Sequence, residues 1–183
     1  MNVACIDAGQ NDAGEPALGG TCTNVGCIPS KAWLQSSEYF EHANKHFAVH
    51  GISADNVQMD VGKMVARKNT VVKQNNDGIA YLFKKNKITF FHGTGAFAAA
   101  KDGGYEISVS GKTEDTLHGK HIIIATGSVA RALPGVPFDE ENILSNDGAL
   151  RMAAVPAKLG VIGSGVIGLE MGSVWRRLGA EVT

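Results

Sequence analysis

A glycine-rich turn between a predicted strand and a predicted helix is the feature that most limits what this chain can fold into. Lys158–Ile162 is an apolar run typical of a buried strand, and Val166–Leu178 has helical periodicity before Gly179, a predicted C-cap. Between them Gly163–Gly168 has the pattern G-x-G-x-x-G, in the order of elements that dinucleotide binding requires. The sequence therefore predicts the start of a Rossmann unit, with a chance glycine turn as the alternative.

Each glycine of this motif has its own predicted task. The first makes a tight turn, the second lets a pyrophosphate approach the backbone, and the third lets the helix pack closely on the strand. The phosphates would then lie on the helix N-terminus. A ribose-binding acid is due about 20 residues after the first glycine, where the sequence stops, so NAD and NADP are not distinguished. The candidate phosphate-binding residues are Gly163, Ser164, Gly165, Val166, Ile167 and Gly168.

The start of the chain has the pattern of the second strand of another Rossmann unit. Asn2–Asp7 is an apolar strand that ends in an acid, and Asp7 would be the ribose-binding carboxylate of that unit. The alternative for Asp7 is an ordinary strand-end residue. A βαβ unit takes roughly 30 residues or more, so we expect about that much to be missing upstream.

A pair of cysteines predicts redox chemistry. Cys22 and Cys27 lie beside a glycine-rich turn, and Pro29 suits the first turn of a helix predicted over residues 27–46. A helix N-terminus stabilises a thiolate, and Lys31 would add positive charge nearby, so we expect a reactive cysteine here. The alternative is a pair of buried small hydrophobic residues.

A disulfide between these cysteines would require a distorted helix. Its Cα atoms must lie within about 7 Å, whereas residues five apart on a regular helix are farther apart. Thr23, Asn24 and Gly26 are residues that favour loops, so we predict a distortion of the first helical turn. Cys5, by contrast, is assigned as a buried small hydrophobic residue.

A zinc site is a competing interpretation of the same cysteines. Cys22, Cys27, His42 and His46 have the spacing C-x4-C-x14-H-x3-H, which is close to that of a structural zinc site. A zinc finger of this kind needs a helix that begins well after the second cysteine, whereas Pro29–Phe40 is already predicted as helical. The net charge of −1 and the pI near 6.6 also differ from the basic balance of a nucleic-acid binder. We therefore expect no metal site and assign both histidines to a solvated helix face.

The middle of the chain predicts a mixed α/β fold. Met59–Phe83 is a predicted long helix with a weak interruption at residues 75–78. A β-meander is predicted from short β-rich runs separated by turns, at residues 88–91, 105–109 and 121–125.

Composition indicates a soluble cytoplasmic enzyme. The chain is 44% hydrophobic and 19% charged, and it contains no apolar run of the roughly 18 residues that span a bilayer. Its three cysteines argue against a secreted disulfide scaffold, while a catalytic disulfide is compatible with the cytosol. We expect neither membrane nor nucleic acid as a partner.

The run Leu18–Ala32 resembles the active-site segment of the pyridine nucleotide-disulphide oxidoreductases. Its Cys-Ile-Pro-Ser-Lys form is most similar to the dihydrolipoyl dehydrogenase branch, and the resemblance covers essentially all of the chain. It implies that residues 1–133 are a partial FAD-binding domain, with a redox-active disulfide and without its first βα unit. Residues 134–183 would be the start of an NAD-binding domain, with Pro134–Pro137 as the crossover loop.

The resemblance also implies a role for each matching residue. Cys22 would be the interchange thiol that forms a mixed disulfide with a lipoyl sulfur, and Cys27 would face the flavin. Lys31 would lie near the flavin ring with Glu170 as its carboxylate partner. The other positions that match cofactor-contacting residues are Asp7, Gly19, Gly20, Thr21, Cys22, Gly95, Thr126, Gly127 and Ser128.

The implied activity passes electrons from dihydrolipoyl groups through the Cys22–Cys27 disulfide and FAD to NAD. The implied partners are the lipoyl domains of 2-oxo acid dehydrogenase complexes or of the glycine cleavage system, and a second subunit of a homodimer. The family's interface domain has no counterpart in this sequence, so we expect a truncated fragment that cannot complete a turnover alone. The alternatives are a catalytically silent fragment and a related reductase of the glutathione or mercuric type.

Overall fold

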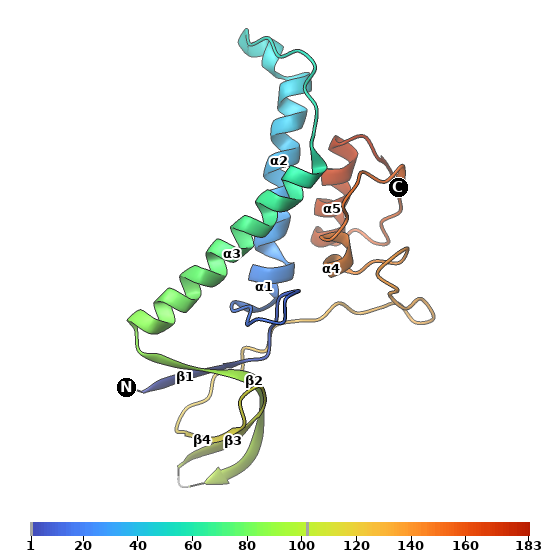
Figure 1. The fold of residues 1–183 in the computed structure, drawn as a ribbon. Helices are drawn as coiled ribbons and strands as arrows, with labels where there is room; N and C mark the ends of the chain where they lie inside the picture. Colours follow the sequence, from blue (N-terminus) through green and yellow to red (C-terminus); the bar gives the residue numbers. More distant parts are fainter. Residues whose placement is uncertain (1, 102) are drawn as a thin grey trace. The chain divides into compact units, whose positions relative to one another are not determined.

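A mixed sheet joins the start of the chain to its middle (Figure 1). β1 (Val3–Asp7) runs parallel to β2 (Ile88–Lys101). β3 (Gly104–Gly111) and β4 (Asp115–Gly119) extend the sheet by antiparallel pairing, in the order β1-β2-β3-β4. The predicted α/β class is therefore confirmed, and β2, β3 and β4 form an antiparallel meander whose third strand differs from the predicted one.

The described part of the chain falls into two units, and each is considered by itself. The structure is a computed structural model that describes residues 2–101 and 103–183. Unit 1 consists of Met1–Asn24 and Gln74–Ser128, and unit 2 consists of Val25–Lys73 and Val129–Thr183. The domain boundary at residues 133 and 134 rests on the resemblance and stays a prediction.

β2 is longer than the predicted strand, which ended at Phe91. It continues to Lys101 through Gly93 and Gly95, with one irregularity between Phe97 and Ala99. Glycine does not end this strand, because its missing side chain lets β3 approach: a Cβ at Gly93 would lie 2.5 Å from the carbonyl oxygen of Ser110.

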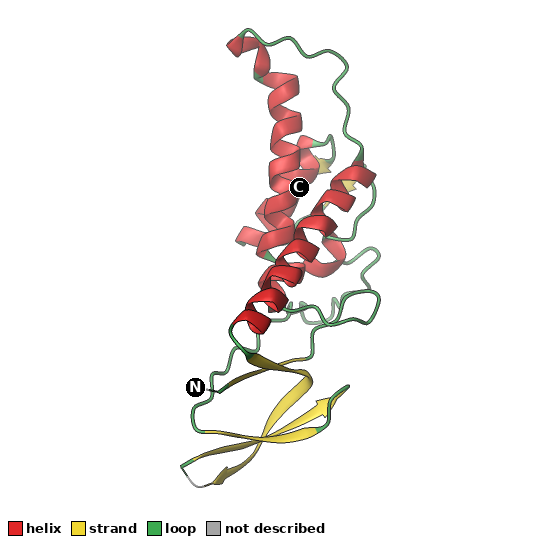
Figure 2. Cartoon of the chain, turned by 60° about the vertical axis from the view of Figure 1, so that its left-hand side comes forward, coloured by secondary structure: helices red, strands yellow, loops and turns green. Residues whose placement is uncertain are grey.

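The strand predicted at residues 121–125 is wrong. The segment is a loop in which Ile123 and Ile124 are 90% and 71% exposed. Figure 2 shows the strands of the structure in yellow and its loops in green. A strand is stable only when a neighbour pairs with its backbone groups, and no strand among the described residues pairs with this one. The pairing position beside β3 is taken instead by β4, which the apolar pattern did not indicate.

α3 (Val61–Lys85) is one continuous helix, so the interruption predicted at residues 75–78 is also wrong. The side-chain amide of Asn76 donates to the carbonyl oxygen of Leu18 and, at 3.0 Å, to Oδ1 of Asn24. These partners outside the helix remove the competition with its backbone that makes asparagine a helix breaker. No helix of residues 2–101 and 103–183 is long and apolar enough to cross a membrane.

Unit 2 is built around two tryptophans. α2 (Cys27–Lys45), which is followed by the 3-10 helix η1 (Phe47–His50), packs against α5 (Val166–Arg177) (Figure 1). Trp33 of α2 and Trp175 of α5 are fully buried, and their rings meet edge to face with centroids 5.3 Å apart. The other buried members of this core are Met64, Leu150, Met171, Val174 and Ala180.

A buried lysine and a helix cap complete the packing of unit 2. Lys68 is 8% exposed, donates to the carbonyl oxygen of Leu150 at 2.8 Å, and lies over the Trp33 ring. Leu150 directly follows the short helix α4 (Asn146–Ala149), so this bond ties α4 to the core. At the end of α5 the C-cap is Leu178, one residue before the predicted Gly179, and Gly179 follows it with a φ of +108°, the left-handed conformation that commonly ends a helix.

Replacing Trp175 by alanine should lower the unfolding free energy of the chain by about 3–5 kcal/mol, because it removes a buried ring and leaves a cavity. Val49 lies in the same unit with 84% of its surface exposed, so Val49→Ala is the control and should cost less than about 0.5 kcal/mol. Urea unfolding followed by circular dichroism measures both changes. Equal effects of the two substitutions would contradict the assigned core.

Glu41 connects α2 to α5 and should make stability depend on pH. Its carboxylate binds Lys45 at 2.9 Å and Arg177 at 3.0 Å. The hydrogen bond from Lys45, with the charges of Lys45 and Arg177, lowers the pKa of Glu41. A carboxyl group with a lowered pKa in the folded state stabilises that state above its ordinary pKa, and this contribution is lost as the pH falls through the lowered value.

Glu41→Gln should therefore lower the unfolding free energy at pH 7 by about 0.5–1 kcal/mol, and the difference from the wild type should shrink as the pH is lowered towards 2. Glu38→Gln, at an exposed position of the same helix, is the matched control. Urea unfolding at a series of pH values gives both curves. A difference that does not vary with pH would show that the charge of Glu41 is not involved.

Candidate functional site

Two loops far apart in the sequence meet in unit 1 through one hydroxyl group. Thr21 Oγ1 donates to the carbonyl oxygen of Ser128 at 2.9 Å and accepts from the Ser128 N–H at 3.1 Å. Thr21 lies in α1 (Gly20–Val25), a short helix that the sequence analysis did not predict. The contact brings together two groups of predicted cofactor-contacting residues: Gly19, Gly20 and Thr21 with Thr126, Gly127 and Ser128.

Backbone conformation explains the glycines on both sides of this contact. Gly19, Gly20 and Gly127 have φ angles of +106°, +63° and +75°, which other residues rarely adopt. A Cβ at Gly127 would lie 2.8 Å from Thr21 Oγ1 and would push the loops apart. At Gly20 nothing lies within 4 Å of the Cβ position, so the backbone at the start of α1 is open to a ligand group.

Two asparagines hold the loop before α1, a task that the sequence analysis missed. Asn24 donates from Nδ2 to the carbonyl oxygens of Ala17 at 3.0 Å and Gly20 at 2.9 Å. Asn76 of α3 donates to the carbonyl oxygen of Leu18 and to Asn24 itself. From its position between the cysteines, Asn24 was interpreted only as a residue that favours a loop. No local pattern marks Asn76, because its partners are more than 50 positions away in the sequence.

Asp7 lies at the carboxyl end of β1, which is the end where parallel sheets bind ligands. It faces His92 across the β1–β2 pair. One of its carboxylate oxygens accepts from the Gly9 N–H at 2.8 Å, a bond that an ordinary strand-end aspartate makes. Gly95 lies further along β2, where a Cβ would contact Ile6 Cδ1 at 3.1 Å. The ribose-binding role of Asp7 and the flavin contact of Gly95 stay predictions.

The two cysteines lie on separate helices. Cys22 lies within α1, and α2 begins at Cys27. Gly26 between the helices has φ −136° and ψ −117°, so the predicted distortion is confirmed, as is the predicted helix, whose C-cap is His46. Both cysteine side chains are exposed, which excludes the alternative of two buried hydrophobic residues. Cys22 belongs to unit 1 and Cys27 to unit 2, and their redox role stays a prediction.

Cys5 differs from the exposed cysteines. It is half-buried in β1, and burial, with a smaller contribution from the charge of Asp7, raises the pKa of its thiol. The thiolate is the reactive form of cysteine, so Cys5 is expected to be the less reactive site. It therefore provides an internal control for experiments on Cys22 and Cys27.

In unit 2 an ammonium, a carboxylate and a buried hydroxyl form one cluster. Lys31 of α2 makes an ion pair with Glu170 of α5, so the contact that the resemblance implies is present, while its functional role stays a prediction. Ser30 Oγ lies 3.0 Å from Glu170 Oε2 and 3.2 Å from the carbonyl oxygen of Cys27. The sequence analysis missed Ser30, because the partner that reveals its task is 140 positions away.

The glycine-rich turn has the geometry that its sequence predicts. β5 (Lys158–Leu159) pairs in parallel with β6 (Glu181–Val182), so the predicted strand is present in shorter form. Gly163 makes the turn with a φ of +94°. Gly165 is the N-cap of α5 in extended conformation. Because it is a glycine, it has no side chain to cover the helix N-terminus.

The three glycines of the motif differ in the space around them. A Cβ at Gly168 would lie only 2.7 Å from Val161 Cγ1, so this glycine lets α5 lie close to the segment that follows β5. At Gly163 and Gly165 nothing lies within 4 Å of the Cβ position. The backbone N–H groups at the start of α5 are therefore accessible, which is the condition for binding a phosphate group. The residues present fit a dinucleotide.

The zinc interpretation of the cysteine and histidine spacing is wrong. Cys27 begins α2, whereas His42 lies in its last turn, so roughly 22 Å of helix separates the two side chains. Residues 2–101 and 103–183 contain no group of three or more His, Cys, Asp or Glu side chains that could hold a metal ion.

Gly168→Ala should lower the unfolding free energy by about 1–2 kcal/mol, because the added methyl group meets the stiff side chain of Val161. Gly78→Ala is the matched control: it is also within a helix, but its Cβ position has no neighbour within 4 Å. The control should be stabilised by about 0.5–1 kcal/mol through helix propensity. Urea unfolding compares the two, and effects of the same sign would contradict the close packing at Gly168.

Comparison with known proteins gives a consistent result. The sequence model of the pyridine nucleotide-disulphide oxidoreductases matches residues 1–183. The dihydrolipoyl dehydrogenase of Cupriavidus necator is 51% identical over 185 residues, which cover 100% of this chain and 38% of that protein. The human mitochondrial dihydrolipoyl dehydrogenase is 47% identical over 191 residues, which cover 100% of this chain and 35% of that protein.

Solved structures agree in fold. LpdA from Mycobacterium tuberculosis matches 99% of this chain and 38% of its own with a TM-score of 0.85 at 22% identity. RclA, an HOCl-induced flavoprotein disulfide reductase from Escherichia coli, matches 100% of this chain and 36% of its own with a TM-score of 0.74 at 25% identity. The chain thus spans little more than a third of the proteins that it matches. Because the family model covers the whole sequence and relatives share about half of its residues, the chain belongs to the pyridine nucleotide-disulphide oxidoreductase family.

Proposed function

We propose that this chain is the disulfide-bearing part of a dihydrolipoyl dehydrogenase. The observation that carries the proposal is the contact between Thr21 and Ser128, because it joins the loop that leads into the cysteines to the Thr-Gly-Ser turn. Relatives named dihydrolipoyl dehydrogenase, which are 47–51% identical over the whole chain, support the same assignment.

The proposed reaction of the cysteines is thiol–disulfide exchange. A thiolate of a dihydrolipoyl group attacks Cys22 Sγ of the Cys22–Cys27 disulfide, which forms a mixed disulfide and releases the Cys27 thiolate. The second lipoyl thiolate then attacks the lipoyl sulfur of the mixed disulfide and releases the Cys22 thiolate. The lipoyl group ends as a cyclic disulfide, two protons are released, and the two cysteines carry the two electrons.

Position supports separate roles for the two thiols. Cys27 is the first residue of a 19-residue helix, and the partial positive charge of a helix N-terminus favours the thiolate form of a cysteine placed there. Lys31 lies one turn further along the same helix and is held by Glu170. We assign Cys22 to exchange with the lipoyl group, Cys27 to the flavin side, and the Lys31–Glu170 pair to the region beside the flavin.

The proposed cofactors are FAD and NAD. FAD would be held in unit 1 by the backbone at Gly19–Thr21 and at Thr126–Ser128, with Asp7 on its ribose and Gly95 beside it. Bound FAD would supply the two-electron chemistry that links the dithiol to NAD. The open backbone at Gly163–Gly168 would hold the NAD pyrophosphate.

The proposed partners follow from the proposed substrate. A dihydrolipoyl group is presented by the lipoyl domains of 2-oxo acid dehydrogenase complexes or of the glycine cleavage system, and a homodimer in the cytoplasm is the proposed assembly.

Residues 1–133 would form part of the FAD domain and residues 134–183 part of the NAD domain. That this chain alone cannot complete a turnover stays a prediction, which lipoamide-dependent reduction of NAD by the purified chain would contradict.

The proposal is tested by visible absorption of the purified chain. FAD is added, unbound FAD is removed by desalting, and spectra are recorded before and after anaerobic reduction with dihydrolipoamide. We expect retained flavin and, on reduction, a long-wavelength band from a thiolate next to the flavin. A colourless protein after desalting would contradict the assignment of FAD to this chain.

Cysteine variants identify the thiol that gives the band. Cys27→Ser should retain flavin and lose the band, because the thiolate next to the flavin is gone. Cys22→Ser should show the band before any reductant is added, since Cys27 then has no disulfide partner. Cys5→Ala, at the half-buried position, should behave like the wild type. A band that survives in Cys27→Ser would contradict the assigned roles.

A further inference from the structure

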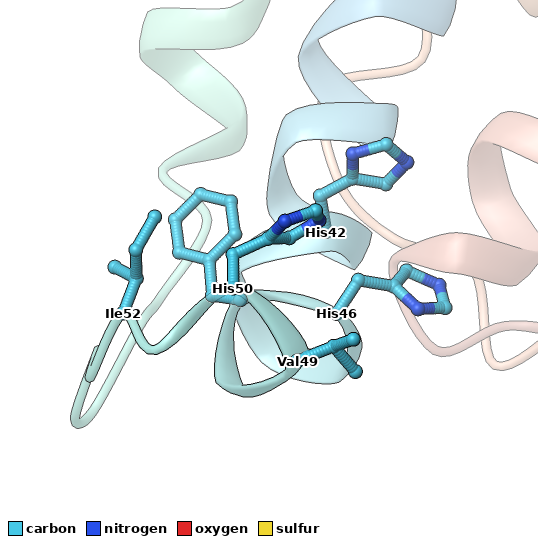
Figure 3. A pocket seen from close by; sticks show the side chains of 6 residues that line it. His42, His46, Val49, His50 and Ile52 are labelled. Atoms are coloured by element: carbon cyan, nitrogen blue, oxygen red, sulfur yellow. The ribbon is translucent and has the colours of Figure 1, made fainter.

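Two imidazoles lie together at the carboxyl end of α2, outside the site described above. His42 and His46 are one helical turn apart, and their ring centroids are 5.3 Å apart with an angle of 84° between the planes. Figure 3 shows both side chains among those that line a pocket, together with His50 of η1. We propose that His42 and His46 form a two-ligand binding site for a divalent late transition-metal ion, with Cu²⁺ bound most tightly.

The helix holds the two ligands in place. Residues four positions apart lie on the same face of a helix, which is the spacing that two histidines use when they bind one metal ion from a single helix. The His46 N–H donates to the carbonyl oxygen of His42 at 2.9 Å, so the backbone of both ligands belongs to the same helical turn. The carboxyl end of a helix carries partial negative charge, which favours a bound cation.

The separation of the rings fits a shared ion. An imidazole nitrogen lies about 2.1 Å from a bound metal, which puts each ring centre about 3.2 Å from it, so two rings on one ion have centres roughly 4.5–6.4 Å apart. The observed 5.3 Å falls within this range.

The surroundings leave room for the remaining ligands. A pocket of about 430 Å³ opens here, lined by His42, His46, Phe47, Val49, His50 and Ile52. His42 and His46 are both exposed, so an ion can reach them from solvent. Lys45, on the same turn, directs its ammonium group to Glu41 at 2.9 Å, which offsets its repulsion of a cation.

The protein supplies two ligands here, and water completes the coordination. Among the described residues no three His, Cys, Asp or Glu side chains are placed to hold one ion, so His50 lines the pocket without being a ligand. Imidazole ligands suit Cu, Ni and Zn, and the affinity of such sites rises towards Cu²⁺ and falls again at Zn²⁺. Mg²⁺ and Ca²⁺ require oxygen ligands and should not bind.

The site is tested by titrating the untagged chain with Cu²⁺ against a chromophoric competing chelator. Cys22 and Cys27 are exposed and would bind the same metals, so all proteins carry Cys22→Ser and Cys27→Ser. We expect one Cu²⁺ per chain, with His42→Ala and His46→Ala each weakening binding about tenfold or more, because each removes one arm of a chelate. Circular dichroism checks that the variants fold.

Control variants separate this site from other imidazoles. His50→Ala and His121→Ala, which replace exposed histidines inside and outside the pocket, should each change the affinity less than about twofold. Electron paramagnetic resonance of the Cu²⁺-loaded chain, which does not depend on any histidine variant, should show two imidazole nitrogens. Binding that is unchanged in His42→Ala/His46→Ala, or that His50→Ala weakens as much as either ligand variant, would overturn the proposal.

Discussion

The edge-to-face contact between Trp33 and Trp175 determines how α2 lies against α5, and the polar contacts of unit 2 depend on it. Burial of an aromatic side chain contributes several kcal/mol, whereas an ion pair at the surface contributes about 1 kcal/mol or less. Lys31 keeps 61% of its side chain exposed, so its ion pair with Glu170 does not hold the helices together. The packing of the two tryptophans therefore determines where Lys31 and Glu170 lie, and their ion pair forms at that position.

Unit 1 depends on a different constraint, which is backbone conformation. The loop that carries Gly19 and Gly20 can meet the turn at Gly127 only because all three residues adopt positive φ angles. Thr21 then satisfies both backbone groups of Ser128 with one hydroxyl group. The result is a contact between parts of the chain that are about a hundred residues apart. The glycines allow the backbone conformations that this contact needs, and Thr21 makes the hydrogen bonds.

Patterns that depend on neighbours in the sequence were predicted well. The strand, turn and helix at Gly163–Gly168 and the helix that begins at Cys27 both follow from local rules of backbone conformation and capping. The distortion at Gly26 also follows from local residue type, since glycine adopts backbone conformations that interrupt a regular helix. The pairing of Lys31 with Glu170 was foreseen only through resemblance to a family, because nothing in local sequence connects them.

Patterns that depend on distant partners were missed. Ile122–Ile124 has strand propensity, yet a strand needs a paired neighbour, and the described residues provide none. Asn76 looks like a helix breaker but is bound by Leu18 and Asn24, so α3 continues through it.

By itself the sequence determined the class of fold, the two glycine-rich turns, the cysteine pair and the family, because these depend on residue type and spacing along the chain. Only the tertiary structure decided which loops meet at Thr21 and that Ser30 contacts Glu170. Hydrogen bonds and ligand geometry depend on distances in space between side chains, and those distances are established when the helices and strands pack.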